Sequence, residues 1–157
     1  MDGVNELSDA ATRGDRQSVA GSLGGGANVN QADVNGETPL CAALRAGHLE
    51  VAQALLAQDG VAVNRADDEG TSPLVIASEG GHLEVVRALL ANEGLDVNQA
   101  DVDGLTALDA ALEEGNVEIA SVLRAAGARE REEPEEESGS DVDSEDESGS
   151  DEDGETR

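Results

Sequence analysis

The sequence of 157 residues contains no phenylalanine, tyrosine or tryptophan, no lysine, and a single cysteine. Every apolar contact must therefore come from aliphatic side chains, Met1 or Cys41. The composition argues against a nucleic-acid partner, because phosphate binding needs clustered cations and single strands also need stacking aromatics. One cysteine cannot form an internal disulfide, which argues against a cross-linked secreted scaffold.

Long apolar runs are also missing. No stretch approaches the ~20 apolar residues that span a bilayer, and no basic segment followed by an apolar one opens the chain. We therefore expect no membrane partner and a cytoplasmic location. The nucleus is the alternative, because a chain of this size is small enough to diffuse through nuclear pores.

What the sequence has in excess is negative charge. Thirty-six Asp and Glu residues face nine arginines, for a formal net charge of −27 at pH 7. Residues 130–157 hold 15 of the acids, two arginines and one aliphatic residue, Val142. Such a segment cannot bury enough apolar surface to offset the entropy of ordering it. The sequence predicts a folded domain over 1–129, a disordered polyacidic tail over 130–157 and, because like charges repel, a monomer.

A period of 34 residues runs through the domain. Gly36, Gly70 and Gly104 lie 34 residues apart, and a Val-Asn pair recurs at the same interval, at 29–30, 63–64 and 97–98. Regular repetition of this kind indicates an array of supersecondary units that are stable only when they stack.

Each unit reads as a turn followed by two short helices. Gly70 suits a turn that needs a positive φ, and Ser72 with Pro73 is typical of a helix start. Apolar residues then recur at helical spacing from about His82 to Leu90. Helices this short are unstable alone, so the units are expected to bury their apolar sides against each other.

These units resemble the ankyrin repeat. The clearest matches are the Thr-Pro-Leu, Gly-His and Val-Asn motifs, found here at 38–40, 47–48 and 63–64, with Ser-Pro-Leu at 72–74 in the next unit. The resemblance implies an all-α solenoid of stacked helix-turn-helix units with β-turn loops. It comprises a degenerate N-terminal half-cap at about 5–32 and repeats at about 33–66, 67–100 and 101–129. The family's histidine after Thr-Pro-Leu is replaced by Cys41, Val75 and Asp109.

The resemblance also implies where a partner binds, since ankyrin proteins commonly use the turn tips and the exposed ends of the first helices. Carried over position by position, the tip candidates are Val34, Asn35, Glu37, Asp68, Glu69, Thr71, Val102, Asp103 and Leu105. The helix-end candidates are Arg13, Arg45, Glu79, Glu113 and Glu114. The expected function is a non-catalytic protein–protein interaction module, an adaptor or scaffold without a cofactor.

The charges on these positions change sign along the array. Arg13 and Arg45 lie toward its N-terminus, whereas Glu79, Glu113 and Glu114 lie toward its C-terminus. This gradient favours a partner with a basic segment that docks on the later repeats, although a merely solvated surface would have the same composition. An alternative function is an acidic chaperone or buffer of basic, histone-like proteins that acts through the tail. A fragment of a longer repeat scaffold is a third reading.

Four local features suggest other chemistry, and each has a simpler interpretation. His48 and His82 are too far apart to share a metal ion if units stack at the ~8–10 Å of packed helices. Cys41 has no cation near it in sequence and fits a packed position. The glycines at 21–26 lack the Lys and Ser/Thr of a phosphate loop. The Asp-rich turns lack the distal glutamate of a calcium loop.

The tail contains a second regular feature. Five serines are each followed three residues later by an acid, a spacing that resembles the target of acidophilic casein-kinase-2-type kinases. Each phosphate would add about −1.5 to −2 charges at pH 7. A plain solubility segment is the alternative. The candidate phosphorylation sites are Ser138, Ser140, Ser144, Ser148 and Ser150.

Overall fold

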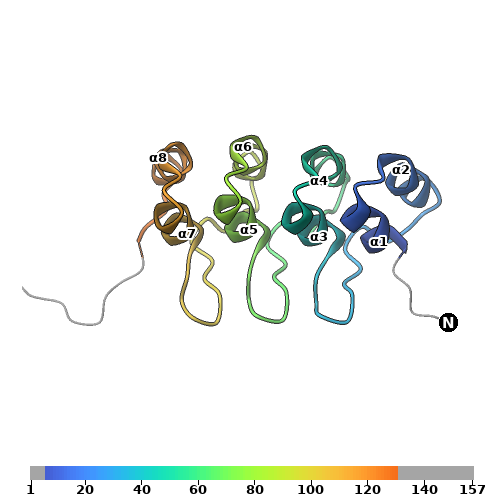
Figure 1. Cartoon of the computed structure of the whole chain (residues 1–157), viewed down its shortest axis with the longest axis horizontal. Coiled ribbons are helices and arrows are strands. Elements are labelled where there is room, and N and C mark those ends of the chain that lie inside the picture. The colour runs from blue at the N-terminus through green and yellow to red at the C-terminus, as the bar shows by residue number, and fades with distance from the viewer. Residues whose placement is uncertain (1–5, 131–157) are drawn as a thin grey trace, which may run out of the picture.

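Four helix pairs stand side by side along one axis (Figure 1). The structure, a computed structural model, describes residues 6–130, and within that range it has eight α-helices and no β-strand. The helices are α1 (Glu6–Arg13), α2 (Arg16–Gly24), α3 (Pro39–Ala46), α4 (Leu49–Leu56), α5 (Pro73–Glu79), α6 (Leu83–Leu90), α7 (Ala107–Glu113) and α8 (Val117–Ala125). The predicted all-α solenoid is confirmed.

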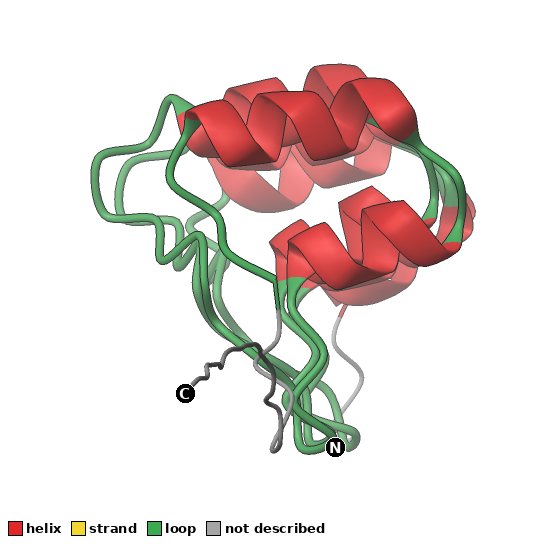
Figure 2. Cartoon of the chain, turned by 90° about the vertical axis from the view of Figure 1, so that its left-hand side faces the viewer, coloured by secondary structure: helices red, strands yellow, loops and turns green. Residues whose placement is uncertain are grey.

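The solenoid has two helical layers and a fringe of loops. Figure 2 looks along the array and shows the first helices of the pairs in one layer and the second helices in the other. The long loops that connect successive pairs all extend to the same side, and their turns end in a common row at the bottom of Figures 1 and 2. The helices thus carry a row of turn tips along one edge.

Side-chain caps fix where the first helices begin. The backbone N–H of Cys41 donates to Thr38 Oγ1, and that of Val75 donates to Ser72 Oγ, both at 3.3 Å. In α7, Thr106 and Asp109 cap one another reciprocally. Asp109 fills the position of the missing family histidine, so at least in this unit the substitute stabilises its own helix start.

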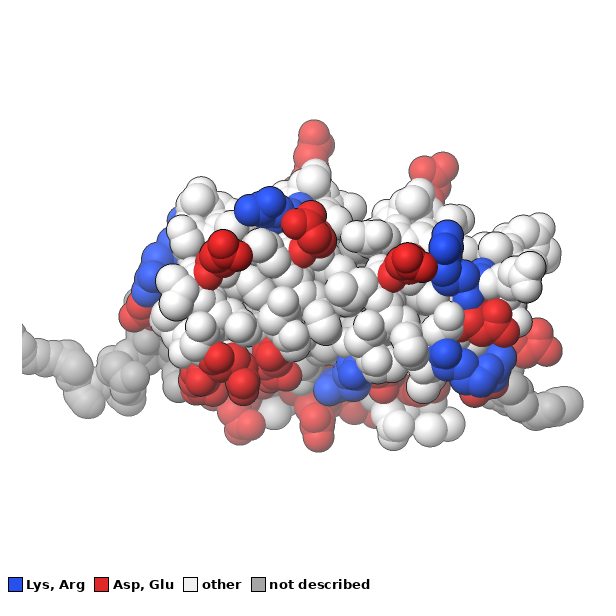
Figure 3. All heavy atoms as spheres, turned by 45° about the horizontal axis from the view of Figure 1, so that its top comes forward, with Lys and Arg blue, Asp and Glu red and all other residues white. Residues whose placement is uncertain are grey.

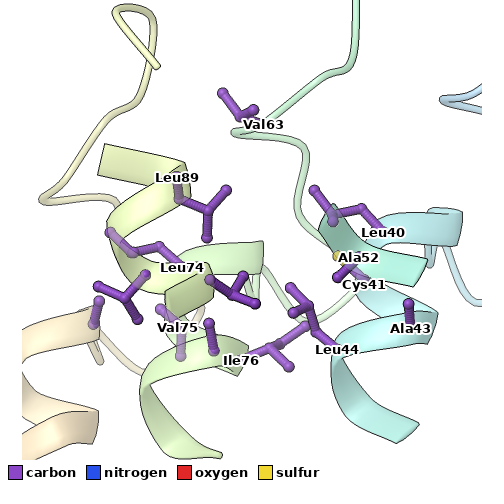
Figure 4. Packing of buried hydrophobic residues seen from close by; sticks show 14 of the residues in the cluster. Leu40, Cys41, Ala43, Leu44, Ala52, Val63, Leu74, Val75, Ile76 and Leu89 are labelled. Atoms are coloured by element: carbon purple, nitrogen blue, oxygen red, sulfur yellow. The ribbon is translucent and has the colours of Figure 1, made fainter. Parts of the chain in front are cut away.

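The core is a continuous aliphatic seam. Its larger members include Leu40, Leu74 and Leu108, which recur at the 34-residue interval and are each 1% exposed. Figure 4 shows side chains of α3 and α5 approaching one another across a unit boundary, with Leu44 and Ile76 between them. Each pair therefore buries apolar surface against its neighbour as well as within itself.

The first unit differs from the sequence prediction. A half-cap was expected ahead of residue 33, but α1 and α2 form a full helix pair. Asp15 explains part of this, because its carboxylate accepts the N–H of Ser18 and holds the start of α2. α2 continues through Gly21 to Gly24, although glycine costs about 0.5–1 kcal/mol relative to alanine inside a helix.

A repeated asparagine clamp links each unit to the next. Asn64 Nδ2 donates to the carbonyl of Gly94 at 2.6 Å, and Asn64 Oδ1 accepts the N–H of Asp96 at 2.8 Å. Asn30 holds residues 60 and 62 in the same way, and Asn98 holds residues 127 and 129. The period of the Val-Asn pairs thus has a physical cause: one amide side chain satisfies two backbone groups of the following unit.

Replacing Asn64 with alanine should lower the free energy of unfolding by about 1–2 kcal/mol, because two net hydrogen bonds are lost. Urea unfolding followed by far-UV circular dichroism measures this, since the chain has no tryptophan or tyrosine. Asn35→Ala is the matched control, because Asn35 lies exposed at a tip. Equal losses in the two variants would mean that the clamp contributes nothing specific.

Candidate functional site

The three tips are built alike and joined to one another. Asp33 Oδ1 accepts the N–H groups of Asn35 and Glu37, at 2.8 and 3.0 Å, and Asp67 and Asp101 make the equivalent bonds. Neighbouring tips are joined through the backbone, because the N–H of Asp68 donates to the carbonyl of Asn35 at 3.1 Å. The aspartates that suggested calcium therefore use an oxygen to close turns.

Close approach between tips explains the periodic glycines. Gly70 has a φ of +81°, and a Cβ atom there would lie 3.1 Å from the backbone of Asp101 and Val102 in the next turn. Any other residue would be strained by its backbone angle and crowded by the neighbouring unit. The row of tips is consequently a fixed platform.

The platform exposes apolar as well as charged side chains. Val34 is 94% exposed and Val102 is 74% exposed, and they occupy the same position in the first and third tips. The middle tip has Asp68 there, also exposed. Single exposed apolar residues are common, but two at equivalent positions of a rigid row are suited to contact with a partner.

Arg45 joins two units on this face. Its guanidinium is 3.3 Å from Glu37 Oε2 in its own unit and forms an ion pair with Asp67 Oδ2 in the next one. These three residues line a hollow of about 260 Å³ with Asn35, Asp68 and Glu69. Five of the predicted site residues are therefore brought together here.

One unit further on, the equivalent position is acidic. Glu79 takes the place of Arg45, and Asp101 takes the place of Asp67. Partial burial raises the pKa of Glu79; the charge of Arg45 opposes this, and the nearby charges of Glu114, Asp101 and Glu113 raise the pKa further. Within residues 6–130 no salt bridge reaches Glu79. The tips and the C-terminal ends of the first helices form one face of the array. We call Glu79, Asp101, Glu113 and Glu114 the acidic half of this face.

Other predicted residues lie elsewhere or are less accessible. Thr71 is only 8% exposed, because its backbone groups close the turn onto Asp67. Leu105 is half-buried and packs on the core. Arg13, at the end of α1, forms an ion pair with Asp9. Thr71 is therefore too buried to take part in a contact surface. The other predicted residues Asp103, Glu113 and Glu114 are exposed.

The histidines and the cysteine, which the sequence analysis considered as metal ligands or as a reactive thiol, occupy structural positions. His48 and His82 are the N-cap residues of α4 and α6. Among residues 6–130, no three His, Cys, Asp or Glu side chains are grouped to hold a metal ion. Cys41 is fully buried, and burial raises the pKa of its thiol to about 11. No helix in the same range is long and apolar enough to cross a membrane.

Charge on the second-helix layer is sparse by comparison. Figure 3 shows scattered acidic and basic side chains over the upper part of a largely uncharged surface, and a group of adjoining acidic side chains at its lower left. The candidate phosphorylation sites at 138, 140, 144, 148 and 150 lie outside the described residues.

Two sets of contacts between units were not predicted from the sequence. The pairing of Arg45 with Asp67 was not expected, although both residues stand in periodic positions. The role of Asn30, Asn64 and Asn98 was also missed, although the repeated Val-Asn pairs were visible. A period shows that a residue is needed in each unit, but the contact it makes lies 29–32 residues away along the chain.

Stacked helix pairs with a row of turn tips define a helical-repeat protein. The family model described as ankyrin repeats (3 copies) matches residues 7–101 and also residues 60–132, which together are most of the chain. The chain therefore belongs to the ankyrin-repeat family. A search of curated proteins finds no match to it. Ankyrin repeats are generally non-catalytic modules for protein–protein interaction.

Replacing Glu79 with glutamine should stabilise the protein at neutral pH. The pKa of Glu79 is raised in the folded state, so folding favours its protonated form, and ionisation destabilises the fold as pH rises above the ordinary value of 4.5. The gain in melting temperature should be present at pH 7 and disappear below about pH 4.5. A gain that persists at pH 4 would point to a cause other than charge.

The Cys41 thiol should react slowly in the folded protein. A pKa of about 11 against an ordinary 9.0 reduces the thiolate at pH 8 by roughly a hundredfold, and burial blocks access as well. The rate of labelling by a chromogenic disulfide reagent, with and without urea, measures this. Equal rates under the two conditions would contradict the buried position.

Proposed function

We propose that this protein is an adaptor that binds a basic segment of a partner protein on its tips and on the acidic half of the face. The observation that carries the proposal is the geometry of Arg45. One guanidinium there satisfies a carboxylate of its own unit and a carboxylate of the next. One unit further on, Thr71 stands in place of Glu37, Asp101 in place of Asp67 and Glu79 in place of the arginine, so two carboxylates are present and the cation is missing.

A cation from a partner would complete this second arrangement. An Arg or Lys side chain placed beside Glu79 and Asp101 would pair with both carboxylates, and it would oppose the burial and the neighbouring acids that together raise the pKa of Glu79. Planar, delocalised arginine suits a site with two carboxylates better than lysine does. The expected ligand is therefore an extended or helical segment with arginines.

The tip valines supply the apolar part of the proposed contact. Val34 and Val102 project from a platform that Asp and Gly residues already hold rigid, so binding would order few side chains at the tips. Charged contacts at an exposed rim chiefly set encounter rate and partner choice, whereas buried apolar contacts prolong the complex. The two kinds of residue thus have complementary roles.

The tail has an auxiliary role in this proposal. Its 15 acids would attract a basic partner over distances limited by the Debye length of about 8 Å at physiological salt. Phosphorylation at the candidate serines would strengthen that attraction. If the tail were itself the binding site, the protein would be the acidic chaperone considered above, and its repeats would be only a carrier.

The test compares charge changes of equal size at two places on the full chain. A partner captured from the source cell is titrated calorimetrically against Glu79→Gln/Glu113→Gln/Glu114→Gln and against Asp59→Asn/Glu84→Gln/Glu93→Gln. The control residues are exposed but lie on or after second helices. Because each exposed charge pair contributes about 0.2–1 kcal/mol, the first variant should bind roughly tenfold more weakly and the control should be close to wild type.

Two outcomes would contradict the proposal. An equal loss of affinity in both triple variants would mean that only net charge matters. Loss of all binding when residues 131–157 are removed, with both triple variants unchanged, would support the chaperone alternative.

A further inference from the structure

The two ends of the solenoid are not equivalent. Leu44 and Ser78 occupy the same position in successive units and are 1% and 0% exposed, because the next unit covers them. Leu112 occupies that position in the last helix pair and is 41% exposed. Figure 2 looks onto this end of the array, where α7 and α8 are the last described helices.

A second position repeats the pattern. Leu83 lines a hollow of about 280 Å³ together with residues 115–119 of the following unit, and it is half-buried. Val117 occupies the same position in α8 and is 76% exposed. A third position has changed instead: Leu56 and Leu90 are followed there by Arg124, whose guanidinium is 2.7 Å from Glu130.

The N-terminal end has lost its apolar character more completely. Counted from the N-cap of each helix, Ser18 and Ser22 of α2 replace the buried Val51 and Leu55 of α4. These serines line an open hollow of about 740 Å³ in company with acidic and basic side chains of α1. A polar outer face is what caps a repeat array against further stacking. The first unit has such a face, whereas the last keeps two apolar stacking residues.

The last unit also keeps the backbone geometry of an interior one. Asn98 binds the carbonyl of Gly127 at 3.3 Å and the N–H of Arg129 at 2.8 Å, as Asn64 binds the unit before it. The pair α7/α8 is therefore held in the position that would receive a following unit. The exposed side of the α7/α8 pair is thus already formed in the absence of a ligand.

The charge around this face selects its occupant. Glu113 and Glu114 follow Leu112 directly, Glu118 follows Val117, and Glu130 lies beside Arg124 of α8. A second copy that docked its own C-terminal end here would bring two such acidic rims together. Its polar N-terminal face would offer no apolar match either. The occupant must bring apolar side chains and positive charge.

We propose that Leu112 and Val117 form a docking face, here called the open end, for an amphipathic helix of a partner protein. The helix presents an apolar stripe at i, i+3, i+4 spacing to these two side chains and carries Lys or Arg on its flanks toward Glu113, Glu114 and Glu118. It takes the place that the first helix of a further unit would take. Leu112 and Val117 are not tip residues, but Glu113 and Glu114 belong to both proposed surfaces, so variants of the two apolar side chains distinguish this proposal from the adaptor function on the tips.

Synthetic helical peptides test this on the full-length protein. One peptide has a leucine stripe with flanking arginines. A second has the same charge with glutamine in place of leucine, and a third has the leucine stripe with flanking glutamates. Methyl NMR of the leucine and valine residues reports binding. The first peptide should shift the Leu112 and Val117 signals saturably, and the other two should leave them nearly unchanged.

Variants then separate the open end from the tips. Leu112→Ser/Val117→Thr should weaken binding of the first peptide about tenfold, and both side chains are exposed, so the fold is retained. Ala57→Ser/Ala91→Ser, at two exposed positions outside both proposed surfaces, is the control and should not change it. Equal shifts with the glutamine peptide, or unchanged binding by the Leu112/Val117 variant, would overturn the proposal. So would sedimentation of the wild type as a dimer that this variant abolishes, because a second copy would then be the occupant.

Discussion

Contact between neighbouring units is the interaction on which the rest of this structure depends. No helix within residues 6–130 exceeds nine residues, so none of them would be stable without the pair beside it. The seam between pairs is made of leucine, valine, isoleucine and alanine together with Cys41, and its many small contacts replace the few large ones that aromatic side chains provide elsewhere. The asparagine clamps make this packing specific, because each asparagine side chain fixes the position of a loop in the following unit through two hydrogen bonds.

The sequence predicted this architecture well because periodic positions report local needs. Gly70, Ser72 and Pro73 each have a backbone reason that is visible within a few residues. The full first helix pair could not be predicted in the same way. Glycines at 21 and 24 oppose α2, and what favours it includes the cap at Asp15 and burial of Val19 at 1% exposure, a long-range effect. The contacts of Arg45 and of the asparagines were likewise hidden, since their partners lie in another unit.

The arrangement of charge follows from the same modular construction. Each repeat supplies a carboxylate near the base of its tip and one side chain at the end of its first helix. Exchanging that one side chain therefore changes the local charge between two neighbouring units. Arg45 pairs with the carboxylates at its position, whereas Glu79 leaves the next position strongly negative. Function on such a scaffold is therefore set by a few residues on fixed positions, while the seam beneath them stays the same.

The identical clamp at residues 30, 64 and 98 has an evolutionary consequence. Any in-frame duplication of 34 residues would create a unit whose asparagine meets the correct loop ahead and whose own loop meets the correct asparagine behind. Recombination could thus lengthen or shorten the array without new compensating substitutions in the interior. The first unit, with its polar outer face, and the last, with its acidic rim, depart from this interior pattern, so such exchange is expected chiefly between them.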